Sequence, residues 1–89
     1  MPPEERRKAA IRFHLAIAAA HVAPDCTLKG LAVLAGINPN YLWNIARGAD
    51  NLSVKVAMAI EAVAGRDICS RADLLPEIFD YADGATHVE

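Results

Sequence analysis

The sequence predicts an all-α domain of four to five helices. The chain is 54 % hydrophobic and 22 % charged, which is typical of a folded protein, and its abundant alanine and scarce aromatic residues (6 %) favour closely packed helices over strands. Apolar residues recur at three- and four-residue spacing, and capping residues and glycines divide the chain into short segments. With 89 residues the chain is long enough for one small domain, which we expect over residues 1–79.

The first helix is expected to begin at Pro2-Pro3 and to end at Pro24-Asp25. Prolines are tolerated in the first turn of a helix, and the acidic residues Glu4 and Glu5 suit the positive end of its dipole. One face of this helix is apolar and carries Ile11, Leu15, Ala18, Ala19 and Val22. The opening turns carry a basic cluster, which is either a solvated face or a phosphate clamp: Arg6, Arg7, Lys8 and Arg12.

Two further helices are predicted from their capping residues. Thr27 can cap a second helix, Leu28 to Ala35, through its hydroxyl. Asn38-Pro39 can open a third helix, because proline suits the first helical position and keeps the residue before it out of helical angles. This third helix is expected to run to about Arg47, with Gly48 as its left-handed terminator.

A fourth helix, Val54 to Ala64, is expected after a Ser53 cap. Beyond it, residues 66–69 are expected to be extended. Ser70 and Asp73 have the spacing of a capping box and predict a short last helix.

The last residues, 80–89, are expected to form a frayed, acidic C-terminal tail. Residues 73–89 contain five acidic and no Lys or Arg residues, whereas residues 1–72 contain nine basic and six acidic ones. The net charge of −2 excludes a strongly basic chromatin-type protein but not a DNA-binding protein that reads sequence. The tail is either a solvated end that aids solubility or a segment that competes for a nucleic-acid surface.

Cys26 and Cys69 are expected to be buried, reduced thiols, as in a cytoplasmic protein. They form no C-x-x-C motif, and His21 with Cys26 supplies only half of the about four ligands that a zinc site needs. We therefore expect no metal and no cofactor. No apolar run approaches the about 18 residues of a membrane helix, and the run from Leu15 to Ala20 is too short for a secretory signal.

The most informative pattern lies between residues 27 and 48. Ala32 is a small residue where two helices can cross closely, and four positions later Gly36 suits the positive φ of a tight turn. Three apolar residues then hold the third helix against the second: Ile37, Leu42 and Ile45. This spacing is the signature of a helix-turn-helix.

The third helix, about residues 39–47, has a polar face opposite its apolar one. At about 100° per residue, that face and the preceding cap carry five candidate base-reading residues, Asn38, Asn40, Trp43, Asn44 and Arg47. Asn can pair bidentately with adenine and Arg with guanine in the major groove. Candidate phosphate contacts are Thr27, Lys29 and Lys55. Three interpretations of Trp43 remain open: it packs on a thymine methyl or a sugar, it is buried against another chain, or it packs over its own fold.

The run G-I-N-P-N-Y-L-W-N-I-A-R-G at residues 36–48 resembles the lambda-repressor-like (Cro-type, XRE) helix-turn-helix superfamily. The runs A-I-E-A-V-A-G at 59–65, S-R-A-D-L at 70–74 and P-E-I-F at 76–79 are similar to the ending of the prophage Cro/YdaS-like family, although Leu75 stands where that family has Arg. The resemblance implies a compact DNA-binding domain that reads bases through the same five positions. It also implies homodimers on near-palindromic operators, in the cytoplasm and nucleoid of a bacterial or phage-infected cell.

Two functions remain open, and neither is an enzyme, because no acid, base and nucleophile come together and no small-molecule substrate is indicated. The first is a sequence-specific DNA-binding transcriptional regulator with double-stranded DNA as its partner. The second is a protein-interaction module of the toxin, antitoxin or antirepressor type, favoured by the acidic balance and by an apolar C-terminal segment. That segment is either a strap on the protein's own core or a homodimer contact, and it comprises Leu74, Leu75, Ile78 and Phe79.

Overall fold

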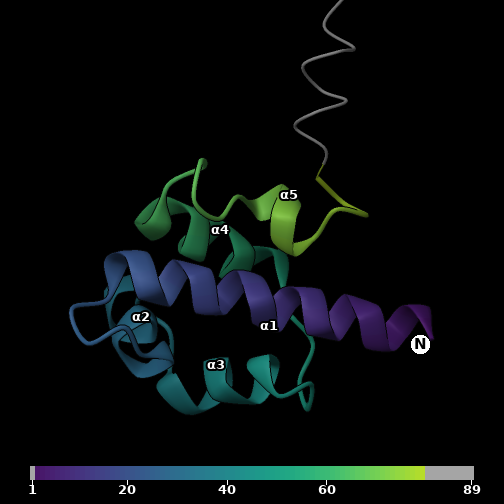
Figure 1. Cartoon of the computed structure of the whole chain (residues 1–89), viewed down its shortest axis with the longest axis horizontal. Coiled ribbons are helices and arrows are strands. Elements are labelled where there is room, and N and C mark those ends of the chain that lie inside the picture. The colour runs from purple at the N-terminus through teal and green to yellow at the C-terminus, as the bar shows by residue number, and fades with distance from the viewer. Residues whose placement is uncertain (1, 80–89) are drawn as a thin grey trace, which may run out of the picture.

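The structure, a computed structural model, describes residues 2–79 and contains five helices and no strand within them (Figure 1). The helices are α1 (Pro3–Val22), α2 (Leu28–Ala35), α3 (Pro39–Ala46), α4 (Val54–Ala64) and α5 (Arg71–Leu74). The all-α prediction is confirmed. The predicted acidic tail, residues 80–89, lies outside the described residues.

The 20-residue helix α1 is the central element, and it packs against each of the other four helices. It runs across the middle of Figure 1, with α3 on one side of it and α4 and α5 on the other. Four residues of the predicted apolar face are buried, Ile11, Leu15, Ala18 and Ala19, and the fifth, Val22, is partly buried against the same core. Because α3 packs on one side of α1 and the α4–α5 pair on the other, α3 lies at one edge of the molecule.

The turn between α2 and α3 is closed by glycine, as predicted. Gly36 has φ +73, and the amide of Ile37 donates to the carbonyl of Ala32 at 2.8 Å. A side chain in this left-handed region costs about 1–2 kcal/mol. Around the turn Ala32 and Leu42 are fully buried. Ile45 is buried and Ile37 is partly buried against the same core.

The predicted caps form in the structure. The hydroxyls of Thr27 and Ser53 accept hydrogen bonds from backbone amides of the first turns of α2 and α4. Ser70 and Asp73 make a reciprocal capping box at α5. The third helix ends one residue earlier than expected, with Arg47 as its cap and Gly48 at φ +85.

The prediction that residues 66–69 are extended is wrong. The carbonyl of Gly65 accepts the amides of both Ile68 (3.1 Å) and Cys69 (3.0 Å), so the segment folds into a turn. The physical reason is burial: Cys69 is fully buried, and reaching the core directly after α4 requires the chain to double back.

The prediction that both cysteines are buried is wrong for Cys26. Cys26 is exposed in the loop before α2, where it adopts φ +58, and both thiols are free. Cys69 is fully buried in the core. Burial, together with the nearby carboxylates of Asp73 and Glu61, raises the pKa of Cys69 to about 12.

The contact between α4 and α5 depends on a largely buried ion pair. Glu61 accepts from the Arg71 side chain (Nε to Oε1, 2.9 Å) and from the Arg71 backbone amide (3.1 Å). The Arg71 guanidinium also lies 5.3 Å from the centre of the Phe79 ring. One carboxylate therefore fixes the start of α5.

Among residues 2–79 no helix is both long and apolar enough to cross a membrane.

Replacing Glu61 should destabilise the fold strongly. Glu61→Gln removes the carboxylate that pairs with Arg71 in a largely buried site, and we expect a loss of about 2–3 kcal/mol of unfolding free energy in urea titrations. Glu77→Gln is the matched control, because Glu77 pairs with Arg7 at the surface. An exposed pair contributes less than about 1 kcal/mol, so equal losses in the two variants would contradict this interpretation.

The two thiols should differ sharply in reactivity. Iodoacetamide at pH 8 should alkylate Cys26 in the folded protein and leave Cys69 untouched until denaturant is added, because only a thiolate reacts and the Cys69 thiol is both enclosed and neutral. Peptide mass spectrometry after timed labelling distinguishes the two sites. Simultaneous labelling of both cysteines in the native protein would show that α4, α5 and the turn between them do not enclose Cys69.

Candidate nucleic-acid interface

The outer face of α3 carries the predicted polar row. Leu42, Ile45 and Ala46 are buried, and the opposite side presents Asn40, Trp43 and Arg47 to solvent. Trp43 is 57 % exposed, so it does not serve as a cover for the protein's own core. Asn44 is half-buried at the edge of the same row.

Arg47 is held in place by Asn44. The guanidinium Nε of Arg47 donates to Oδ1 of Asn44 at 2.9 Å. This bond uses Nε and leaves the Nη groups as the donors that a guanine edge could accept. It also engages one lone pair of the Asn44 oxygen, so in the free chain Asn44 positions Arg47.

Asn38 caps α3, as its position before Pro39 predicts. Its Oδ1 accepts from the backbone amides of Asn40 (2.8 Å) and Tyr41 (3.4 Å). The candidate base readers are therefore unequal: Asn40, Trp43 and Arg47 form the outward row, while Asn38 and Asn44 use their side-chain oxygens within the protein.

The N-terminus of α2 already faces a carboxylate. The Thr27 hydroxyl donates to Oδ1 of Asp25 at 2.7 Å, and the Thr27 amide donates to the same oxygen at 3.1 Å. These two bonds hold the pKa of the Asp25 carboxyl below its usual value. A Cβ on Gly30 would approach Oδ1 of Asp25 to 2.5 Å, so glycine makes room for that carboxylate. Thr27, a candidate phosphate contact, therefore stands beside a negative charge.

The other two candidate phosphate contacts are exposed. Lys29 lies on the first turn of α2, close enough to Asp25 to interact with its charge. Lys55 lies on the first turn of α4 and lines a surface groove with Asn38 and Tyr41 of the α3 region. Lys55 therefore stands beside the N-terminal end of α3.

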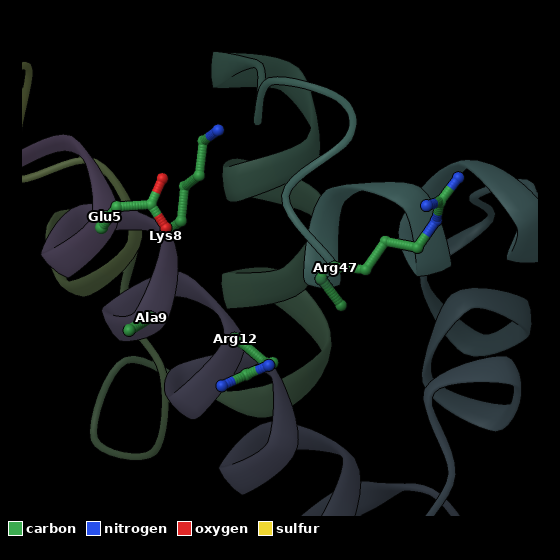
Figure 2. A pocket seen from close by; sticks show the side chains of 6 residues that line it. Glu5, Lys8, Ala9, Arg12 and Arg47 are labelled. Atoms are coloured by element: carbon green, nitrogen blue, oxygen red, sulfur yellow. The ribbon is translucent and has the colours of Figure 1, made fainter.

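Another groove lies between α1 and α3, and part of the basic cluster of the first helix lines it (Figure 2). It has a volume of about 180 Å³, and we call it the α1–α3 groove; it is lined by Glu5, Lys8, Ala9, Arg12, Ala46 and Arg47. Lys8 and Arg12 are four residues apart and share one face of α1, and this spacing is the feature of the sequence that indicates a basic surface there. That this face lies against the end of α3 depends on tertiary packing.

The apolar C-terminal segment packs mainly on its own chain. Leu74 and Leu75 are almost completely buried, which favours the strap interpretation and removes both from reach of a partner. Phe79 is partly buried against the core, and Ile78 is 56 % exposed. Of the four candidate dimer contacts, only the last two have surface to offer.

The two histidines among residues 2–79 take part in local contacts rather than in a cluster. The ring of His14 lies edge-on to Phe13 at 5.6 Å, and Nδ1 of His21 is 2.9 Å from the carbonyl oxygen of Ile17. Within residues 2–79 no three His, Cys, Asp or Glu side chains gather as a metal site would require.

Comparison of the chain with protein-family models, with curated proteins and with solved structures finds no match. The candidate interface therefore has to be interpreted from its own geometry and charge.

Proposed function

We propose that this chain is a sequence-specific DNA-binding transcriptional regulator of the lambda-repressor-like helix-turn-helix type. In this proposal α2 and α3 form the helix-turn-helix and α3 enters the major groove. The observation that carries it is the outward row of Asn40, Trp43 and Arg47, with Arg47 held by Asn44. These residue types read base edges, and they stand on a helix whose other face is buried.

The dimensions of α3 suit this role. A major groove is about 12 Å wide, and an α-helix with its side chains is about 10–12 Å across. The eight residues of α3 span about 12 Å at 1.5 Å per residue. One such helix reads only a few base pairs, so the proposal includes a homodimer on a near-palindromic operator. The prophage Cro/YdaS-like setting and the bacterial cytoplasm belong to the same proposal.

A second candidate function is favoured by the exposed apolar side chains. Val33 and Leu34 on α2 are 63 % and 49 % exposed, and with Pro24 they line a shallow apolar hollow. Together with Trp43 they give the surface apolar character that protein partners bind. A protein-interaction module of the toxin, antitoxin or antirepressor type therefore remains the alternative.

Arg47 should contribute specificity rather than charge alone. An operator is first selected from random duplexes at physiological salt. Arg47→Ala should then weaken operator binding by about 1–3 kcal/mol, which is roughly 5- to 150-fold, and relax one base position. Arg47→Lys keeps the charge but loses the planar fork, so it should lose discrimination and keep most of the affinity for random DNA. Fluorescence anisotropy measures both, and unchanged operator affinity in Arg47→Ala would contradict the base-reading assignment.

Trp43 is the only tryptophan of the chain and should report on which partner binds. Adding operator duplex should change its emission, because its exposed ring lies in the reading row. The Trp43→Phe variant, which has no tryptophan, is the blank. If duplex leaves the emission unchanged at concentrations that saturate anisotropy, Trp43 does not contact DNA and the row is not used as proposed.

A further inference from the structure

We infer that the α1–α3 groove binds the phosphodiester backbone of the DNA strand that runs beside α3, with Lys8 and Arg12 as the contacts. This inference rests on the proposed function, and it assigns a part of the protein outside α2 and α3. The chemistry of the ligand is a row of phosphate anions, recognised by charge rather than by sequence.

The position of the groove is the first reason. Ala46 and Arg47, in and just after the last turn of α3, form one wall, and α1 forms the other. A helix almost fills the width of a major groove, so a duplex that receives α3 brings a phosphate backbone along each side of it. Because Ala46 faces α1, the backbone on that side has to pass over this groove.

The geometry of the two cations is the second reason. Figure 2 shows Lys8 and Arg12 on the side of α1 that faces α3, while the Arg47 side chain extends away from α1. The stem of Lys8 packs over Gly48, where an added Cβ would lie only 3.2 Å from Cδ of Lys8. This contact restrains the stem of Lys8 beside the end of α3.

The third reason is that neither cation is neutralised within the described part of the chain. Arg7, the neighbour of Lys8, pairs with Glu77 on the other side of α1, whereas Lys8 and Arg12 form no ion pair among residues 2–79. Glu5 is the acidic member of the groove, against the two basic side chains of Lys8 and Arg12. The groove is thus locally positive on a chain whose net charge is −2.

The fourth reason is the electrostatic environment at the start of α2. The N-terminus of a helix is an ordinary phosphate site, but here the Asp25 carboxylate lies against it and accepts from the Thr27 hydroxyl and amide, which hold the pKa of Asp25 below its usual value. A DNA phosphate brought to this end of α2 meets a fixed negative charge. This charge disfavours a backbone contact at the start of α2, whereas the α1–α3 groove provides cations.

The test measures the salt dependence of binding to a fluorescein-labelled random-sequence duplex by anisotropy. Removing two phosphate contacts in the Lys8→Gln, Arg12→Gln double variant should lower the slope of log affinity against log salt by about 2. It should weaken binding to operator and random DNA by the same factor, about tenfold or more at low salt. Lys8→Arg with Arg12→Lys keeps both charges and should restore the slope.

Two further variants sharpen the result. Arg6→Gln removes one charge from the same helix, but Arg6 is exposed about 160° around α1 from Lys8, so the slope should not change. Glu5→Gln removes the negative charge from the groove and should tighten binding to both duplexes by about twofold. Thermal melting of each variant verifies that the fold is kept.

The outcomes separate the two proposals. If the wild type binds DNA and Arg47→Lys loses discrimination while the double variant keeps the wild-type slope, the groove assignment is wrong and the proposed function stands. An equal slope change in Arg6→Gln and in single Lys8→Gln would also overturn the assignment, because it would indicate a general charge effect. If the wild type shows no salt-dependent DNA binding, the proposed function and the groove assignment both fail.

Discussion

The close packing of α3 against α2 around the Gly36 turn is the contact on which the rest of the structure depends. The turn is closed by the bond from the Ile37 amide to the Ala32 carbonyl, and Leu42 is fully buried beyond it. Because one face of α3 is fixed in the core, helical geometry directs Asn40 and Arg47 to solvent. The orientation of the exposed row thus follows from apolar contacts on the opposite side of the same helix.

The capping residues could be predicted because they act over three or four positions. Thr27, Asn38 and Ser53 each bond to amides in their own first turn, so their roles can be read from the local sequence. The turn at residues 66–69 could not, because its conformation depends on burying Cys69 in the hydrophobic core. The pairing of Glu61 with Arg71 was missed for the same reason.

The candidate site divides in the same way. Helical periodicity alone identifies the α3 row, but it does not say that the oxygen of Asn44 accepts from Arg47. That bond depends on the rotamers of the two side chains. The α1–α3 groove joins residues almost forty positions apart, and only the packing of α1 across α3 brings Lys8 and Arg12 beside Ala46.

If the proposed function holds, an acidic chain has to concentrate its positive charge where the duplex lies. The net charge is −2, yet cations stand on α1 and at the C-terminal end of α3, while the Asp25 carboxylate lies at the N-terminus of α2. Weak non-specific attraction leaves base contacts with a larger share of the binding energy.

The most direct test is an NMR titration of the ¹⁵N-labelled chain with its selected operator: we expect the largest shifts at the side chains of Asn40, Trp43 and Arg47. Shifts confined to Val33 and Leu34, or none at saturation, would contradict insertion of α3 into the major groove.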